Sequence, residues 1–136
     1  MLPPVELLVC VTCRTAPPAG AAAAGPRDGV RDGARLHAGL VAAGCPEGVA
    51  VRAVDCLSNC GRGCTVALRG GPARWTYVYG NLDPDTHLPA VLDGAARYRA
   101  TPDGLVPWRA RPETFRRNCI ARIPPLTAPE DPHGRA

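Results

Sequence analysis

The chain has 136 residues and a formal net charge of +4 at pH 7. This length fits one domain, and so small a charge does not by itself indicate a nucleic-acid-binding protein. All sixteen basic side chains are arginines, and with one Phe, one Met and two Trp the core must be thin and built from Val, Leu and Ala. No stretch approaches the roughly 20 apolar residues that a membrane span needs, and no signal peptide is evident, so we expect a cytoplasmic protein.

The first half of the chain predicts a β–loop–α–β unit. Residues 5–9 are a short apolar run with strand character, and residues 14–29 are a Pro-, Ala- and Gly-rich loop. Residues 30–43 have helical spacing, and residues 49–54 form a second strand. The apolar face of this helix would consist of Leu36, Leu40 and Ala43, and Gly44 would end the helix.

The second half predicts a hairpin, a helix and an irregular end. Residues 65–68 and 75–79 read as paired strands, and Asp83-Pro84 is a good helix start before Leu88, Val91, Leu92 and Ala95. We therefore place a domain at residues 1–100. Frequent prolines make residues 101–125 an Arg/Pro-rich extension and residues 126–136 a disordered tail.

This element order predicts an α/β fold, a small mixed sheet with flanking helices. The helix between the first two strands makes them parallel, with a right-handed crossover. Their carboxyl ends then lie at one edge of the sheet, where ligands of open α/β sheets usually bind.

Five of the seven cysteines follow these two strands directly. They lie in Cys10-Val11-Thr12-Cys13 and in the segment Cys56-Leu57-Ser58-Asn59-Cys60-Gly61-Arg62-Gly63-Cys64. Isolated cysteines are usually buried fillers, which is how we interpret Cys45 and Cys119. Grouped thiolates at strand ends instead indicate a soft metal centre or redox chemistry.

The segment V-R-A-V-D-C-L-S-N-C-G-R-G-C-T-V-A-L resembles the second cluster loop of thioredoxin-like [2Fe–2S] ferredoxins. The resemblance covers roughly residues 5–98 and implies a thioredoxin-like fold with Cys10, Cys56 and Cys60 as cluster ligands. The ferredoxins space their first two cysteines further apart, and they usually carry proline where Cys64 stands. The fourth ligand is therefore either Cys13 or Cys64.

The whole chain is also similar to a bacterial family of predicted metal-binding proteins. The shared stretches are C-V-T-C-R, C-L-S-N-C-G-R-G-C-T-V-A-L, W-T-Y-V-Y-G-N-L-D-P and G-L-V-P-W-R-A-R-P-E. This resemblance implies a metal-cofactor pathway, such as cobalamin biosynthesis.

Together these features favour an electron carrier that does not catalyse a reaction alone. A [2Fe–2S] cluster suits two facing cysteine loops, and Gly61 and Gly63 would let backbone amides approach its sulfides. The basic surface predicts an acidic redox protein or a metal-cofactor biosynthesis enzyme as partner, rather than nucleic acid or a membrane.

Two alternatives remain open. One is a zinc-binding or metal-handling module, for which Cys10 and Cys13 would form one knuckle. The other is a thiol–disulfide oxidoreductase using the same pair, disfavoured because the helix that would activate the thiolate begins much later. The three histidines lack ligand spacing with any cysteine and are expected on the solvated surface: His37, His87 and His133.

Residues 105–112, L-V-P-W-R-A-R-P, have two interpretations. Arg and Trp are common interface anchors, so this strip could dock a partner. The alternative is a solvated tail that Trp108 staples onto the domain. Arginines continue beyond it at Arg116, Arg117 and Arg122.

Overall fold

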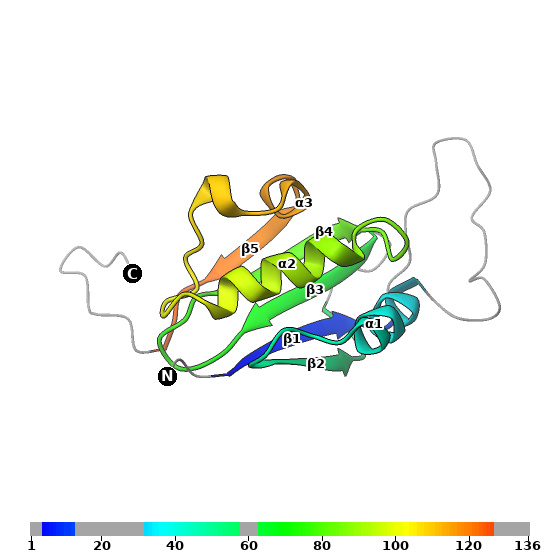
Figure 1. The fold of residues 1–136 in the computed structure, drawn as a ribbon, viewed down its shortest axis with the longest axis horizontal. Coiled ribbons are helices and arrows are strands. Elements are labelled where there is room, and N and C mark those ends of the chain that lie inside the picture. Colours follow the sequence, from blue (N-terminus) through cyan, green and yellow to red (C-terminus); the bar gives the residue numbers. More distant parts are fainter. Residues whose placement is uncertain (1–3, 13–31, 58–62, 127–136) are drawn as a thin grey trace.

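The computed structural model describes residues 4–12, 32–57 and 63–126 (Figure 1). The elements in chain order are β1 (Val5–Cys10), α1 (Asp32–Ala43), β2 (Val49–Val54), β3 (Cys64–Arg69), β4 (Thr76–Leu82), α2 (Leu88–Arg99), the 3₁₀ turn η2 (Trp108–Ala110), α3 (Glu113–Arg117) and β5 (Cys119–Ile123). The strands form one five-stranded sheet in the order β2–β1–β3–β4–β5. The expected α/β fold with a mixed sheet is confirmed.

Strands β1 and β2 pair in parallel, with Val5 opposite Val49 and Cys10 opposite Val54. The other neighbouring strands pair antiparallel. The parallel pair follows from the helical crossover, because a strand that returns through a helix enters the sheet in the same direction. The predicted parallel arrangement of the first two strands is therefore correct.

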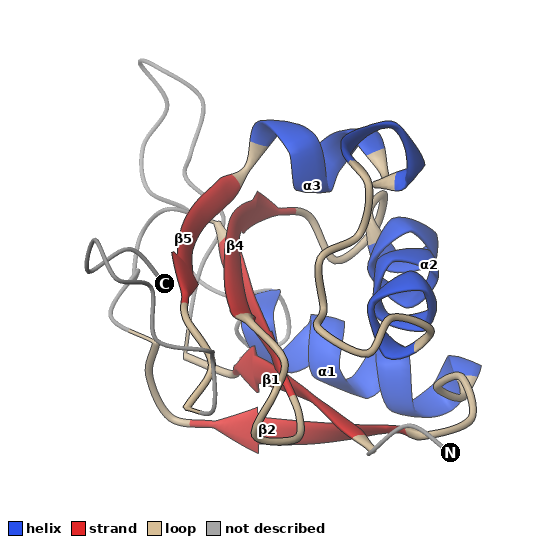
Figure 2. Ribbon diagram, turned by 90° about the vertical axis from the view of Figure 1, so that its left-hand side faces the viewer, coloured by secondary structure: helices blue, strands red, loops and turns tan. Residues whose placement is uncertain are grey.

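The helices lie on one face of the sheet, as Figure 2 shows. Alternate residues of β1 point toward them, and Val5, Leu7 and Val9 are fully buried in the core. Leu36 and Leu40 of α1 complete this side, as predicted. Ala43 was expected on the same face but is exposed, because it is the last residue of α1 and the chain turns away at Gly44, which has a φ of +81°.

The predicted start of the second helix is wrong. Asp83 caps an isolated turn, in which its Oδ1 accepts the N–H groups of Asp85 and Thr86 at 2.7 and 3.3 Å. His87 Nδ1 accepts the Asp83 N–H at 2.9 Å, and α2 begins only at Leu88. The Asp83 side chain does cap backbone N–H groups, but those of a turn that precedes the helix. His87 belongs to this turn and is half-buried, whereas the sequence predicted a solvated side chain.

The segment expected as an extension joins the same sheet and core. Strand β5 pairs antiparallel with β4, and Phe115 of α3 is 2% exposed and stacks on Tyr79 with ring centroids 3.9 Å apart. The prolines break this segment into short elements without removing it from the fold.

Several predicted features fall outside the described residues. They are the loop at 14–29, the tail from 127 onward, Cys13, Cys60, Gly61 and His133. Within the described residues, no helix is long and apolar enough to cross a membrane.

Candidate metal centre

Three cysteines mark one end of the sheet. Cys10 ends β1, Cys56 lies two residues beyond β2, and Cys64 begins the antiparallel strand β3 on the other side of β1. Because β1 and β2 run parallel, their carboxyl ends meet at this end, and β3 starts there. The fold thus brings Cys10, Cys56 and Cys64 to the same end of the sheet, as the strand order predicted for Cys10 and Cys56.

Hydrogen bonds join the first cysteine segment to the second. The Cys10 thiol donates to the Asp55 carbonyl at 3.9 Å, and the Thr12 hydroxyl donates to the same oxygen at 2.5 Å. The Val11 N–H donates to the Val54 carbonyl at 3.0 Å. The chain directly before Cys56 is therefore held against the chain around Cys10.

The first turn of α1 packs onto the backbone of Cys10. A Cβ added at Gly33 would lie 1.9 Å from the Cys10 carbonyl oxygen, so only glycine allows this approach. The start of a helix carries a partial positive charge that favours a nearby thiolate. α1 therefore begins late in the chain but returns in space to the Cys10 backbone, while the Cys10 side chain points to the other face of the sheet.

Cys10 and Cys64 are both fully buried but on different sides of the sheet. Cys64 belongs to the core cluster beneath the helices, together with Val66 and Leu82. Cys10 follows the core residue Val9 in a strand, so its side chain points to the opposite face. This separation favours Cys10 and Cys64 having different roles.

Among the described residues, no three Cys, His, Asp or Glu side chains converge as a metal-binding group. Two predicted ligands, Cys13 and Cys60, lie outside that part of the chain. Of the predicted ligands, the described residues include Cys10 and Cys64, which are buried, and Cys56, which is exposed. Cys10 and Cys56 follow adjacent parallel strands, so both come from the same end of the sheet.

Gly63 has a structural reason to be glycine that the sequence did not reveal. Its φ is +79°, and an added Cβ would lie 2.7 Å from Asn81 Cα, which itself has a φ of +53°. Asn81 Nδ2 in turn donates to Asn118 Oδ1 at 3.3 Å. The end of the second cysteine segment thus packs against Asn81 of β4. A hydrogen bond from Asn81 to Asn118 connects this contact to the start of β5.

We expect Gly63→Ala to lower the melting temperature more than Gly44→Ala does. Both positions have a left-handed φ, which costs an alanine roughly 1–2 kcal/mol. Gly44 has no atom within 4 Å of an added Cβ, whereas Gly63 meets backbone that cannot move aside. Thermal unfolding of both variants measures the difference, and equal losses would show that the Asn81 contact has no energetic importance.

Cys45 and Cys119 lie outside the two cysteine segments of the sequence. Burial raises the pKa of the Cys45 thiol. Burial also raises the pKa of the Cys119 thiol, although Arg111, Arg122 and a bond to the Ala121 carbonyl oppose this rise. Cys45 is half-buried and Cys119 is exposed, so neither is the buried filler that the sequence predicted.

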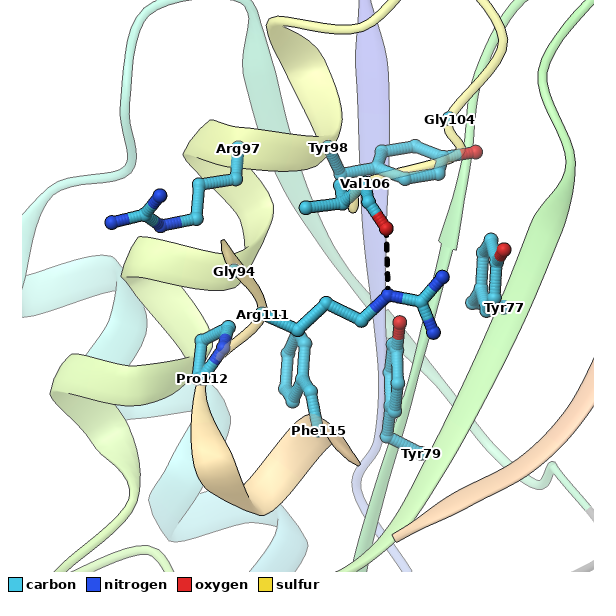
Figure 3. A pocket seen from close by; sticks show the side chains of 10 residues that line it. All are labelled: Tyr77, Tyr79, Gly94, Arg97, Tyr98, Gly104, Val106, Arg111, Pro112 and Phe115. Carbon is cyan, nitrogen blue, oxygen red and sulfur yellow. Dashed lines mark hydrogen bonds between the residues drawn. The ribbon is translucent and has the colours of Figure 1, made fainter. Parts of the chain in front are cut away.

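The arginine-rich strip is partly built into the fold. Arg111 Nε donates to the Val106 carbonyl at 2.8 Å, and its guanidinium lies 5.4 Å from the centre of the Tyr77 ring (Figure 3). The cavity beside it has about 10 Å³ of space, which is room for a single water molecule and not for a ligand. Trp108 is 57% exposed, so it does not anchor this segment in the core. The buried side chain of Phe115, three residues after the strip, does so instead.

The fold and these contacts define an α/β protein that gathers cysteines at the carboxyl ends of two parallel strands. The chain belongs to a protein family of unknown function, DUF1636, whose family model matches residues 7–125. No curated protein and no solved structure matches the sequence significantly.

Proposed function

We propose that this protein is an electron carrier that holds a [2Fe–2S] cluster between its two cysteine segments. The observation that carries this proposal is the shared hydrogen-bond acceptor between them. Cys10 and Thr12 both donate to the carbonyl of Asp55, the residue next to Cys56. A contact between the start of each cysteine segment suits a two-iron centre that would take thiolates from both segments.

We assign the ligands as Cys10, Cys13, Cys56 and Cys60. Cys64 is the less suitable fourth ligand because it packs in the apolar core below the helices, whereas Cys10 points to the other face. The bound cluster would supply one-electron transfer. The chain would hold the thiolates, exclude water around the fully buried Cys10, and tune the potential through hydrogen bonds near the sulfurs.

One observation favours a second candidate, a thiol–disulfide oxidoreductase using Cys10 and Cys13. The first turn of α1 lies against the Cys10 backbone, and a helix start can stabilise an attacking thiolate. Two features oppose it. Cys10 is fully buried, which hinders attack on a protein disulfide, and its side chain points away from the sheet face on which α1 lies.

Visible absorption distinguishes these functions. We expect anaerobically purified protein to be red-brown and to bleach partially on one-electron reduction with dithionite. A colourless protein that binds zinc would point to a metal-handling module. A colourless, metal-free protein that gains two thiols on reduction would identify the oxidoreductase.

A further inference from the structure

The net charge of the protein resides in its last described segment. Residues 104–126 contain five arginines and a single carboxylate, so this segment carries +4, which equals the net charge of the whole chain. Its one carboxylate, Glu113, pairs with Arg117 at 2.9 Å. Within the described part of the chain, the other arginines of the segment form no ion pair: Arg109, Arg111, Arg116 and Arg122.

Two of these arginines lie beside aromatic rings on the helix-covered face of the sheet. The Arg122 guanidinium carbon lies 4.9 Å from the centre of the Trp75 ring, and Arg122 stands opposite Tyr77 in the β4–β5 ladder. Arg111 lies over Tyr77 and 5.7 Å from the Trp108 ring centre. Ring contacts hold a guanidinium in place while its N–H fork remains able to bind a carboxylate in a bidentate manner.

Strand β5 forms an edge of the sheet (Figure 1). All five of its residues are exposed, and among the described strands only β4 pairs with it. An open edge presents backbone N–H and C=O groups to which an extended segment can add as another strand. Side chains alternate in β5: Arg122 shares a face with Tyr77, and Ile123, 53% exposed, shares the opposite face with Thr76.

We propose that the outer edge of β5 binds an extended acidic segment of a partner protein as a sixth strand. Its alternating carboxylates would lie on the face of Arg122 and Arg111, and the aliphatic side chains between them would lie on the face of Ile123. The backbone bonds would provide affinity, and the arginine forks would select for Asp and Glu.

The charge distribution favours this partner over a second copy of the chain. Antiparallel pairing of two β5 strands would bring the surplus positive charge of both copies to one edge, and like charges across neighbouring strands are destabilising. An acidic segment would instead neutralise the arginines that have no ion pair.

The test uses a fluorescent peptide of three Glu-Val repeats and the full-length protein. We expect saturable binding that weakens with salt, together with slowed hydrogen exchange in β5. Arg122→Gln should weaken binding roughly ten-fold, through loss of a charge-assisted hydrogen bond. The matched control is Arg52→Gln, which removes the same charge from β2 at the opposite edge of the sheet and should have little effect.

Two further probes need no protein variant. A Lys-Val peptide and a backbone N-methylated Glu-Val peptide should both fail to bind. Equal binding of the N-methylated peptide, equal losses in the two arginine variants, or no binding at low salt would overturn the proposal. So would a peptide-free dimer that protects the β5 amides, because the occupant would then be a second copy. Since Arg122 lies toward the sheet end opposite the cysteines, this result does not depend on which metal, if any, they hold.

Discussion

Replacing Cys10 or Cys56 with serine should abolish the visible absorption of the purified protein and remove most of its iron. Each serine leaves a hard oxygen where the cluster needs a thiolate. Because the proposed cluster would add to the stability of a thin core, we also expect a lower melting temperature. Cys45→Ser and Cys119→Ser are the matched controls and should retain both the spectrum and the iron, since neither cysteine belongs to the two cysteine segments.

Cys13→Ser and Cys64→Ser separate the two possible ligand sets. We expect Cys13→Ser to behave like Cys56→Ser. Cys64→Ser should keep the cluster and lower stability only, because it places a hydroxyl in the apolar core near Val66 and Leu82. The reverse pattern would mean that Cys64 is the fourth ligand and that our assignment from its side of the sheet is wrong.

Phe115→Ala should destabilise the whole domain by roughly 3–5 kcal/mol, the usual cost of removing a buried aromatic ring. Phe115 is 2% exposed, stacks on Tyr79, and fits so closely against α2 that an added Cβ at Gly94 would lie 2.1 Å from its ring. In a protein with a single Phe and a small core, this loss could unfold the chain at room temperature. Urea unfolding followed by far-UV circular dichroism measures it.

Trp108→Ala provides the comparison for that experiment. It removes a larger aromatic ring from the same segment, but Trp108 is 57% exposed and contacts mainly Arg111. We expect a loss of about 1 kcal/mol or less, the range of an exposed cation–π contact. If both variants were equally mild, the C-terminal segment would be an appendage, as its prolines first indicated.

The parallel strands and the first helix could be predicted because their signals are local. Apolar runs give β1 and β2, and a helical repeat between them sets the parallel direction. The start of α2 was misjudged because Asp83 and Pro84 have the same chemistry in a capped turn as in a helix start. Strand β5 was missed because C-I-A-R-I has an arginine-interrupted pattern and gains its structure from pairing with β4.

The candidate site followed from cysteine spacing, but its supporting contacts did not. Gly33 could be recognised as important only once α1 was seen against Cys10, and Gly63 only once Asn81 lay beside it. Asp55 contributes its backbone carbonyl, so its side chain gave no signal. Such contacts join residues 18 to 45 positions apart, and a single sequence contains no information on which distant residues meet.

The most direct test of the proposed cluster is the metal and acid-labile sulfide content of anaerobically purified, full-length protein. We predict about two irons and two sulfides per chain, the composition of a [2Fe–2S] centre. Stoichiometric zinc without iron or sulfide would contradict the proposal and favour a metal-handling module.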